Sequence, residues 1–193
     1  MPLSSYDFIS PPDLIATVAG FLGGEISLDP ASSNAANEVV GAYKYFTPAH
    51  NGLNQVWRAP NVYLYPPREF LTASEQPKSP LLFEKPKYFQ KSAQRVWLET
   101  AVRKYKVGEF NEGVIFLTSS EVALLTTQKL NLDFPICILK EHPKLYLDQE
   151  GQPKLKNTRC LGFVLYLPSS NNTEKRMGDF IDLFSTVGRV YYQ

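Results

Sequence analysis

The stretch NVYLYPPR, residues 61–68, has the pattern of a buried strand that stops at two prolines. Its aliphatic and aromatic residues favour a strand that is covered on both faces. Pro66 and Pro67 cannot donate to a neighbouring strand, so they end the ladder and fix the direction in which the chain leaves it. In open α/β sheets ligands bind at strand ends of this kind, which makes the stretch a candidate site.

Short apolar strands alternate with helical patterns along the rest of the chain. Helices are expected over residues 10–22, 89–106, 120–130 and 179–184, and strands over residues 25–29, 61–65, 113–118, 134–139, 159–167 and 189–192. A hairpin is expected to begin near Lys144 and to turn at residues 150–151. This alternation predicts an α/β fold with a mainly parallel sheet and helices on both faces, in one domain over residues 1–193. Ser10 is expected to cap the first helix, with Pro11 at its first position.

Composition excludes several classes of protein. The chain has 193 residues, 44% of them hydrophobic and 20% charged, which is ordinary for a globular domain. It has no apolar run of the ~18 residues that a membrane span needs, and no basic-then-apolar leader at its start. Two cysteines and two histidines are too few for a disulfide scaffold, a zinc ribbon or a histidine metal centre. We therefore expect a cytoplasmic protein without metal, with Cys137 and Cys160 as core thiols.

Positive charge is concentrated in one segment. Residues 78–106 hold eight lysines and arginines against two glutamates, although the whole chain has a net charge of only +1. Aromatic residues are interleaved with these cations, a combination that can follow a phosphate backbone and stack on bases. The candidate nucleic-acid contacts are Lys78, Lys85, Lys87, Lys91 and Arg95. A helix with a solvated basic face explains the same pattern, and both interpretations stay open.

A second strand end has the sequence LDPAS, residues 28–32. An acid followed by small residues allows a ligand to approach the backbone. The alternative is an ordinary strand-to-helix turn in which Asp29 caps the backbone that follows it.

Several short motifs occur in a fixed order. They are Ser-Pro-Pro at 10–12, LDPAS at 28–32, Asn34-Ala35, Tyr45-Phe46-Thr47, Asn51-Gly52-Leu53 with Trp57, the strand with Pro-Pro, WLETAVRKYKVG at 97–108, GVIFLTSSE at 113–121, FPICILK at 134–140 and GFVLYLP at 162–168. This ordered set, over roughly residues 8–168, resembles the phage-type DNA adenine-N6 methyltransferases. No single motif is long, and their order carries the resemblance.

The resemblance implies a class I methyltransferase fold, which is Rossmann-like, with S-adenosylmethionine as cofactor and double-stranded DNA as partner. It implies that Ser10 and Pro11 border the methionine end of the cofactor. It also implies that Asp29, Pro30 and Ala31 form the loop that lies against it.

The catalytic positions implied by the resemblance are Tyr65, Pro66, Pro67 and Arg68. The family has Asn or Asp before the two prolines and an aromatic residue after them. The amide or carboxylate oxygen and the first proline's carbonyl accept the two hydrogens of the adenine amine and localise its lone pair, while the aromatic residue stacks on the flipped base. Here Tyr65 stands in place of the acceptor and Arg68 in place of the aromatic residue.

These replacements affect the expected activity. The phenol oxygen of Tyr65 lies farther from the backbone than an amide oxygen, and losing one preorganised polar partner costs about 3 kcal/mol of transition-state stabilisation. Arg68 can stack on a base or hold a phosphate. The inserted Pro-rich basic loop at residues 68–92 is longer than the family's. Three alternatives follow: an active methyltransferase with an altered motif, an inactive relative that binds DNA, cofactor or a protein partner, and a purely structural module.

Overall fold

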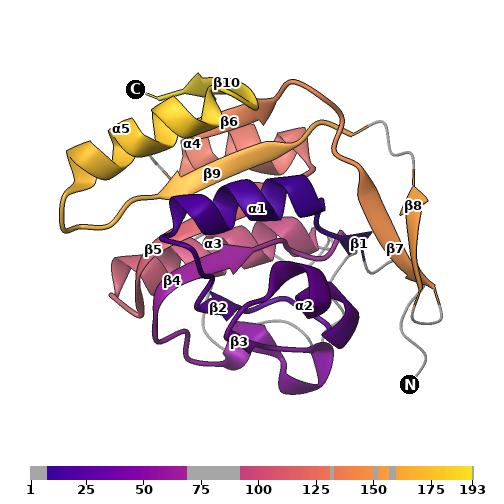
Figure 1. Ribbon diagram of the computed structural model, residues 1–193. Helices are drawn as coiled ribbons and strands as arrows, with labels where there is room; N and C mark the ends of the chain where they lie inside the picture. Colours follow the sequence, from indigo (N-terminus) through magenta and orange to yellow (C-terminus); the bar gives the residue numbers. More distant parts are fainter. Residues whose placement is uncertain (1–7, 69–91, 131–132, 150–151, 157–159, 193) are drawn as a thin grey trace.

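A seven-stranded sheet forms the centre of the computed structural model, which describes residues 8–68, 92–130, 133–149, 152–156 and 160–192 (Figure 1). The strand order is β10-β6-β9-β5-β4-β2-β3. The bounds are β2 (Leu28–Asp29), β3 (Lys44–Tyr45), β4 (Ala59–Leu64), β5 (Phe110–Leu117), β6 (Ile136–Leu139), β9 (Phe163–Leu167) and β10 (Gly188–Tyr191).

The sheet is mixed. Strands β3, β2, β4 and β5 run parallel to one another, and this half is consistent with a Rossmann-like fold. Strand β9 is antiparallel to both β5 and β6, and β10 is antiparallel to β6. The expectation of a mainly parallel sheet is therefore wrong for the second half. A strand that is buried on both faces has the same hydrophobic pattern in either direction, so the sequence did not reveal the reversal.

A second, antiparallel sheet of three strands has the order β1-β7-β8. It consists of β1 (Phe8–Ile9), β7 (Leu145–Gln149) and β8 (Gln152–Lys156). The expected hairpin near Lys144 is confirmed as β7 and β8. The pairing of β1 with β7 was not expected, because a two-residue strand leaves no periodic signal.

Five α-helices and three short helical segments are described. They are α1 (Pro12–Phe21), α2 (Asn34–Val40), α3 (Ala93–Lys106), α4 (Thr127–Lys129) and α5 (Thr173–Phe184), with the 3₁₀ turns η1 (Pro48–His50) and η2 (Gly52–Asn54) and the π-helical turn η3 (Val122–Thr126). Helix α1 begins at Pro12 and is capped by Pro11 without a side-chain bond, so the expectations that Ser10 caps it and that Pro11 takes its first position are both wrong. The hydroxyl of Ser10 accepts a hydrogen bond from Tyr63 instead.

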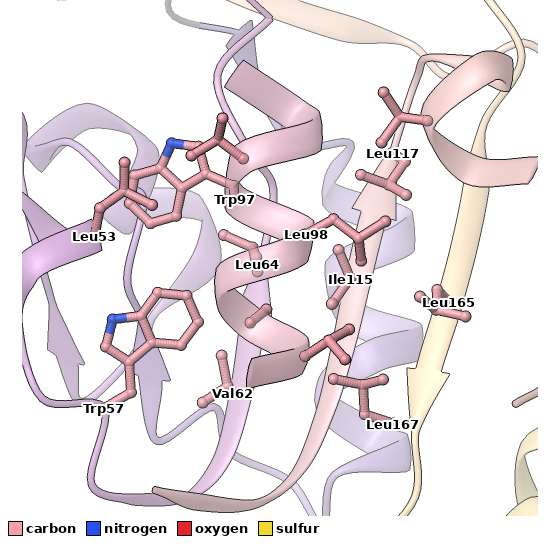
Figure 2. Packing of buried hydrophobic residues seen from close by; sticks show 14 of the residues in the cluster. Leu53, Trp57, Val62, Leu64, Trp97, Leu98, Ile115, Leu117, Leu165 and Leu167 are labelled. Carbon is pink, nitrogen blue, oxygen red and sulfur yellow. The ribbon is translucent and has the colours of Figure 1, made fainter. Parts of the chain in front are cut away.

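Buried side chains form one cluster on each face of the large sheet. Val62 and Leu64 of β4 pack on the α3 side, together with Leu98 of α3 (Figure 2). Tyr63 and Tyr65 alternate with them and pack on the opposite face, with residues of α1 and α5. Helices therefore cover both faces, as expected, and the α1-side and α3-side clusters meet at β4 (Figure 1).

Three further observations concern the described part of the chain. None of its helices combines the length and the apolar character that crossing a bilayer requires. It contains no group of three or more His, Cys, Asp or Glu side chains placed to hold a metal ion. Neither Cys137, which is buried, nor Cys160, which is half-buried, forms a disulfide there.

Candidate functional site

The strand order reverses beside β2. The chain passes from β2 to β3 on one side and then returns to β4 on the other side of β2. The carboxyl ends of β2 and β4 are therefore neighbours, and ligands bind at this point in open α/β sheets. The two strands are followed by the two segments that the sequence singled out, Pro30-Ala31 and residues 65–68.

A pocket of about 300 Å³ lies at this switch point. Its walls come from residues 30–32, 46–48, 51–53 and 65–68, together with Trp97 of α3. The volume is at the lower end of the range for small-molecule sites, about 300–1,000 Å³. Pro30, Ala31 and the whole Tyr65–Arg68 segment therefore lie around one cavity.

Gly52 allows the backbone to pack closely against Pro30 and Trp97 in the pocket wall. A Cβ atom at Gly52 would lie 1.9 Å from the Pro30 carbonyl oxygen and 3.1 Å from the Trp97 ring, so a side chain does not fit there. The Trp57 indole N–H donates to the Gly52 carbonyl at 2.8 Å, and the Trp57 and Trp97 rings stack with centroids 6.0 Å apart (Figure 2). The pocket wall is thus continuous with the α3-side cluster.

Two residues of the pocket wall carry a buried polar atom without a hydrogen-bond partner among the described residues. They are Trp97, through its indole Nε1, and Tyr65, through its hydroxyl. Only 6% of Trp97 and 7% of Tyr65 is exposed. Such groups are rare in folded proteins, because an unpaired buried donor loses its bonds to water without replacement.

The Tyr65 ring packs into the sheet's α1-side cluster. Its centroid lies 4.9 Å from that of Phe116. Burial raises the pKa of the Tyr65 phenol well above its ordinary value, and the charge of Arg68 only partly opposes this shift. The phenol therefore stays protonated throughout the physiological range and cannot act as an anionic acceptor.

Arg68 stands at the exposed end of the same segment. Pro66 is buried, Pro67 is exposed, and the two prolines set the path of the chain to Arg68. Among the described residues that line the pocket, Arg68 alone carries a charge.

Asp29 lies outside the pocket and holds the turn that lines it. It is 3% exposed, and the Ala31 N–H donates to its Oδ1 at 3.1 Å. Burial raises the pKa of Asp29 to about 7, although hydrogen bonds from the Ala31 N–H and the Ser32 hydroxyl lower it. The expected cap of the turn by Asp29 is present, and Asp29 positions Pro30-Ala31 without lining the pocket itself.

The five residues expected at the cofactor do not all converge. Ser10 is 2% exposed and is bonded to Tyr63. Pro11 lines a different pocket of about 350 Å³, between α1 and the segments that follow β6 and precede β10. Pro30 and Ala31 remain the only two of the five in the switch-point pocket.

The cations expected at nucleic acid are only partly described. Lys78, Lys85, Lys87 and Lys91 lie outside the described residues. Arg95 of α3 is paired with Glu99 at 2.8 Å.

Reasoning from residue patterns missed much of the wall as functional. Phe46, Asn51, Gly52, Leu53 and Trp97 were noted as parts of the ordered motifs, without a role in the site. Periodicity could not identify them, because it describes the faces of single elements. The order of the motifs was the one available signal.

Compared with known proteins, the chain matches no family model, no curated protein and no solved structure.

Proposed function

We propose that the chain is an S-adenosylmethionine-binding protein of the phage-type DNA adenine methyltransferase class, in which methyl transfer to adenine is slow or absent. One observation carries the proposal. Residues 30–32 of the LDPAS turn and the Tyr65–Arg68 segment, which the resemblance assigns to cofactor and catalysis, line one pocket at the topological switch point.

The residues of the pocket fit such a cofactor on the β2 side. Ala31 and Ser32 are small, and Trp97 adds a flat apolar wall with an unpaired indole donor. Pro30 and Ala31 would contact the cofactor, and Asp29 would hold their turn through the Ala31 N–H. When bound, S-adenosylmethionine supplies an electrophilic methyl group.

The β4 side lacks one part that amine methylation needs. The lone pair of the adenine amine is delocalised into the ring, which makes the amine a poor nucleophile. Two hydrogen-bond acceptors, one for each amine hydrogen, are needed to localise this lone pair on the nitrogen. Pro66 retains its carbonyl, but the Tyr65 ring packs on Phe116, and its phenol oxygen lies farther from the backbone than the amide oxygen that it replaces. The missing acceptor removes about 3 kcal/mol of transition-state stabilisation, or a hundredfold or more in rate. This supports the inactive alternative, with double-stranded DNA as the partner proposed for the basic segment.

Cofactor binding is tested by calorimetric titration with S-adenosylmethionine. We expect micromolar binding by the wild-type chain and at least a tenfold loss in Ala31→Leu, whose larger side chain would enter the pocket. Ala16→Leu is the matched control, because Ala16 is exposed on α1 and lines neither pocket. Absence of binding by the wild-type chain at millimolar cofactor would contradict the proposal.

Turnover is tested by transfer of labelled methyl groups to duplex DNA. We expect little or no transfer by the wild-type chain. Efficient transfer that is lost in Pro66→Ala would instead make the chain an active methyltransferase. Efficient transfer that persists in both Pro66→Ala and Tyr65→Phe would contradict the assignment of the site.

A further inference from the structure

The large sheet has one edge that is open to a further strand. Strand β10 is the last strand on the side away from the pocket, and no described strand lies beyond it (Figure 1). The other sheet edges are short or interrupted, because β1 and β3 have two residues each and β8 contains a proline and two lysines. Short length, proline and lysine are common means by which natural sheets prevent edge-to-edge pairing. Strand β10 has four residues and contains neither proline nor lysine.

The backbone of β10 offers hydrogen-bonding groups at this edge. The Lys140 N–H donates to the Val187 carbonyl at 3.1 Å, at the start of the pairing between β6 and β10. Bonded pairs alternate along an antiparallel ladder, so the odd-numbered residues of β10 direct their N–H and C=O groups toward β6. The even-numbered residues direct these groups to the open edge; they are Gly188 and Val190 in the strand and Tyr192 directly after it. A row of such groups is satisfied best by another strand.

One register allows β10 to pair with a second copy of itself. In an antiparallel pair with Val190 opposite Val190, Gly188 lies opposite Tyr192, and the bonded pairs use only the groups that point outward. Arg189 then lies opposite Tyr191 of the second copy, so each guanidinium faces an aromatic ring. Arg189 already lies over the Tyr191 ring of its own chain, with its Cζ 5.9 Å from the ring centroid. The neighbouring register would place the two Arg189 side chains opposite each other, and like charges in opposite positions are destabilising.

The same register covers the exposed aromatic side chains at this edge. Tyr191 is 47% exposed and Tyr192 is 59% exposed. Successive residues of a strand point to opposite faces, so one ring lies on each face of the edge. Arg189 of the second copy would cover Tyr191. Tyr192 would lie over Gly188 of the second copy, a position that has no room for a side chain because a Cβ there would lie 2.2 Å from the Cys137 Sγ.

We infer that β10 is a dimerisation strand, which pairs antiparallel with β10 of a second copy about a two-fold axis at Val190 and joins the two large sheets into one. Strands β6, β9 and β5 separate β10 from β4, so the pocket between β2 and β4 stays open in the dimer. The inference therefore does not depend on cofactor binding or on methyl transfer. One short strand from each copy makes a contact smaller than a standard interface, and we expect a dissociation constant in the micromolar range.

The first test is sedimentation velocity of the full wild-type chain from micromolar to near-millimolar concentration. We expect the mass to rise from that of one chain to that of two. Tyr191→Lys places an ammonium opposite Arg189 and should weaken the dimer about tenfold or more. Tyr43→Lys is the matched control, because Tyr43 is 94% exposed and precedes β3 at the opposite end of the sheet. A wild-type chain that stays monomeric throughout, or equal dissociation constants for the two variants, would overturn the inference.

The second test addresses the register. Combining Arg189→Glu with Tyr191→Lys places the new carboxylate of each copy opposite the new ammonium of the other. We expect the double variant to recover most of the affinity that Tyr191→Lys loses. A double variant that dimerises no more tightly than Tyr191→Lys alone would overturn the pairing of Arg189 with Tyr191.

The third test needs no variant and follows amide hydrogen exchange in the wild-type chain. The Val190 N–H points to the open edge, so it should exchange quickly in the monomer and about tenfold or more slowly in the dimer. The Arg189 N–H points toward β6 and should be protected at every concentration. A dimer in which the Val190 amide still exchanges quickly would mean that the copies meet at another surface. Protection of Val190 that does not depend on concentration would mean that another segment of the same chain covers the edge. Either result would overturn the inference.

Discussion

The Tyr63 hydroxyl donates a 2.8 Å hydrogen bond to the Ser10 hydroxyl, between residues that are 53 positions apart in the chain. Both residues are almost fully buried. This bond joins the middle of β4 to the segment that leads into α1, directly behind the carboxyl end of the sheet. Tyr65, two residues later on the same face, has a buried hydroxyl with no described partner. Substitution by phenylalanine is therefore expected to affect the free energy of unfolding differently at Tyr63 and at Tyr65.

Tyr63→Phe should lower stability. The substitution leaves the ring in place but removes the donor to Ser10, so a buried hydroxyl loses its partner. We expect a loss of about 1–2 kcal/mol in the free energy of unfolding, measured by urea denaturation. Tyr43→Phe is the control, because Tyr43 is 94% exposed. Equal stabilities of these two variants would show that the bond contributes nothing.

Tyr65→Phe should change stability by no more than about 1 kcal/mol, because the buried hydroxyl that it removes makes no hydrogen bond of normal geometry and interacts only weakly with Thr118. The packing on Phe116 is retained. The measurement is the same urea titration, with Tyr63→Phe as the comparison. A clear destabilisation would mean that the Tyr65 hydroxyl has a partner in solution.

Asp29→Asn should change how stability depends on pH. In the folded chain burial raises the pKa of Asp29 to about 7, against 3.8 for the ordinary carboxyl. Between these values the unfolded chain releases a proton that the folded chain keeps, so wild-type stability falls as the pH rises from about 4 to about 7 and then levels off.

Asparagine does not titrate and can still accept from the Ala31 N–H. The free energy of unfolding of Asp29→Asn, relative to that of the wild-type chain, should therefore increase between about pH 4 and pH 7. The increase should reach at most about 4 kcal/mol above pH 7. Urea titrations at several pH values measure it. Parallel pH profiles for the two proteins would show that Asp29 ionises normally in the folded chain.

Gly52→Ala should be strongly destabilising. The new Cβ would lie 1.9 Å from the Pro30 carbonyl oxygen, so the turn after β2 would have to move. We expect a loss of about 2–3 kcal/mol by urea denaturation. Gly178→Ala is the control, because Gly178 lies in α5 with open space around it and should gain about 0.5–1 kcal/mol. A small loss in the free energy of unfolding of Gly52→Ala would mean that the turn after β2 moves away from the new Cβ at little cost.

Lys104→Met should destabilise the chain, although Lys104 belongs to the basic segment. Its Nζ is bonded to the Glu109 carboxylate at 2.9 Å and to the Gln55 carbonyl at 2.7 Å, and only 4% of the residue is exposed. Removing the cation leaves a partly buried carboxylate without its counter-charge, at a cost of about 2–3 kcal/mol in urea denaturation. Lys106→Met, at an exposed position, should change little. Comparable stabilities would assign Lys104 to the solvated face of α3.

Local patterns predicted the elements well but not the direction of the later strands. The helix expected over residues 89–106 is α3, and the strand expected over residues 61–65 is β4. Strand β6 does follow a helical connection from β5, as a parallel strand would. However, β9 inserts between them from later in the chain and pairs antiparallel with both. Such an insertion is a long-range event that no local pattern records.

The sequence singled out the two strand ends that border the pocket, through Asp29 and Tyr65, but it did not single out the other residues that line the pocket. Trp97 lies in the helix expected over residues 89–106, but its unpaired nitrogen depends on where Gly52 and Trp57 lie. Ser10 was assigned to the wrong partner, because a serine before two prolines resembles a helix cap whether or not the helix begins one residue later.

The stacking of Trp57 on Trp97 has an optical consequence. Two indoles whose centroids lie 6.0 Å apart, with their planes 23° from parallel, couple their electronic transitions, and we expect this coupling to contribute a far-ultraviolet circular dichroism signal that Trp97→Phe removes. Because one ring belongs to the pocket wall and the other to the core behind it, this signal reports the integrity of the wall separately from the helix content. The chain thus carries an intrinsic chromophore pair at its candidate site, readable without any label.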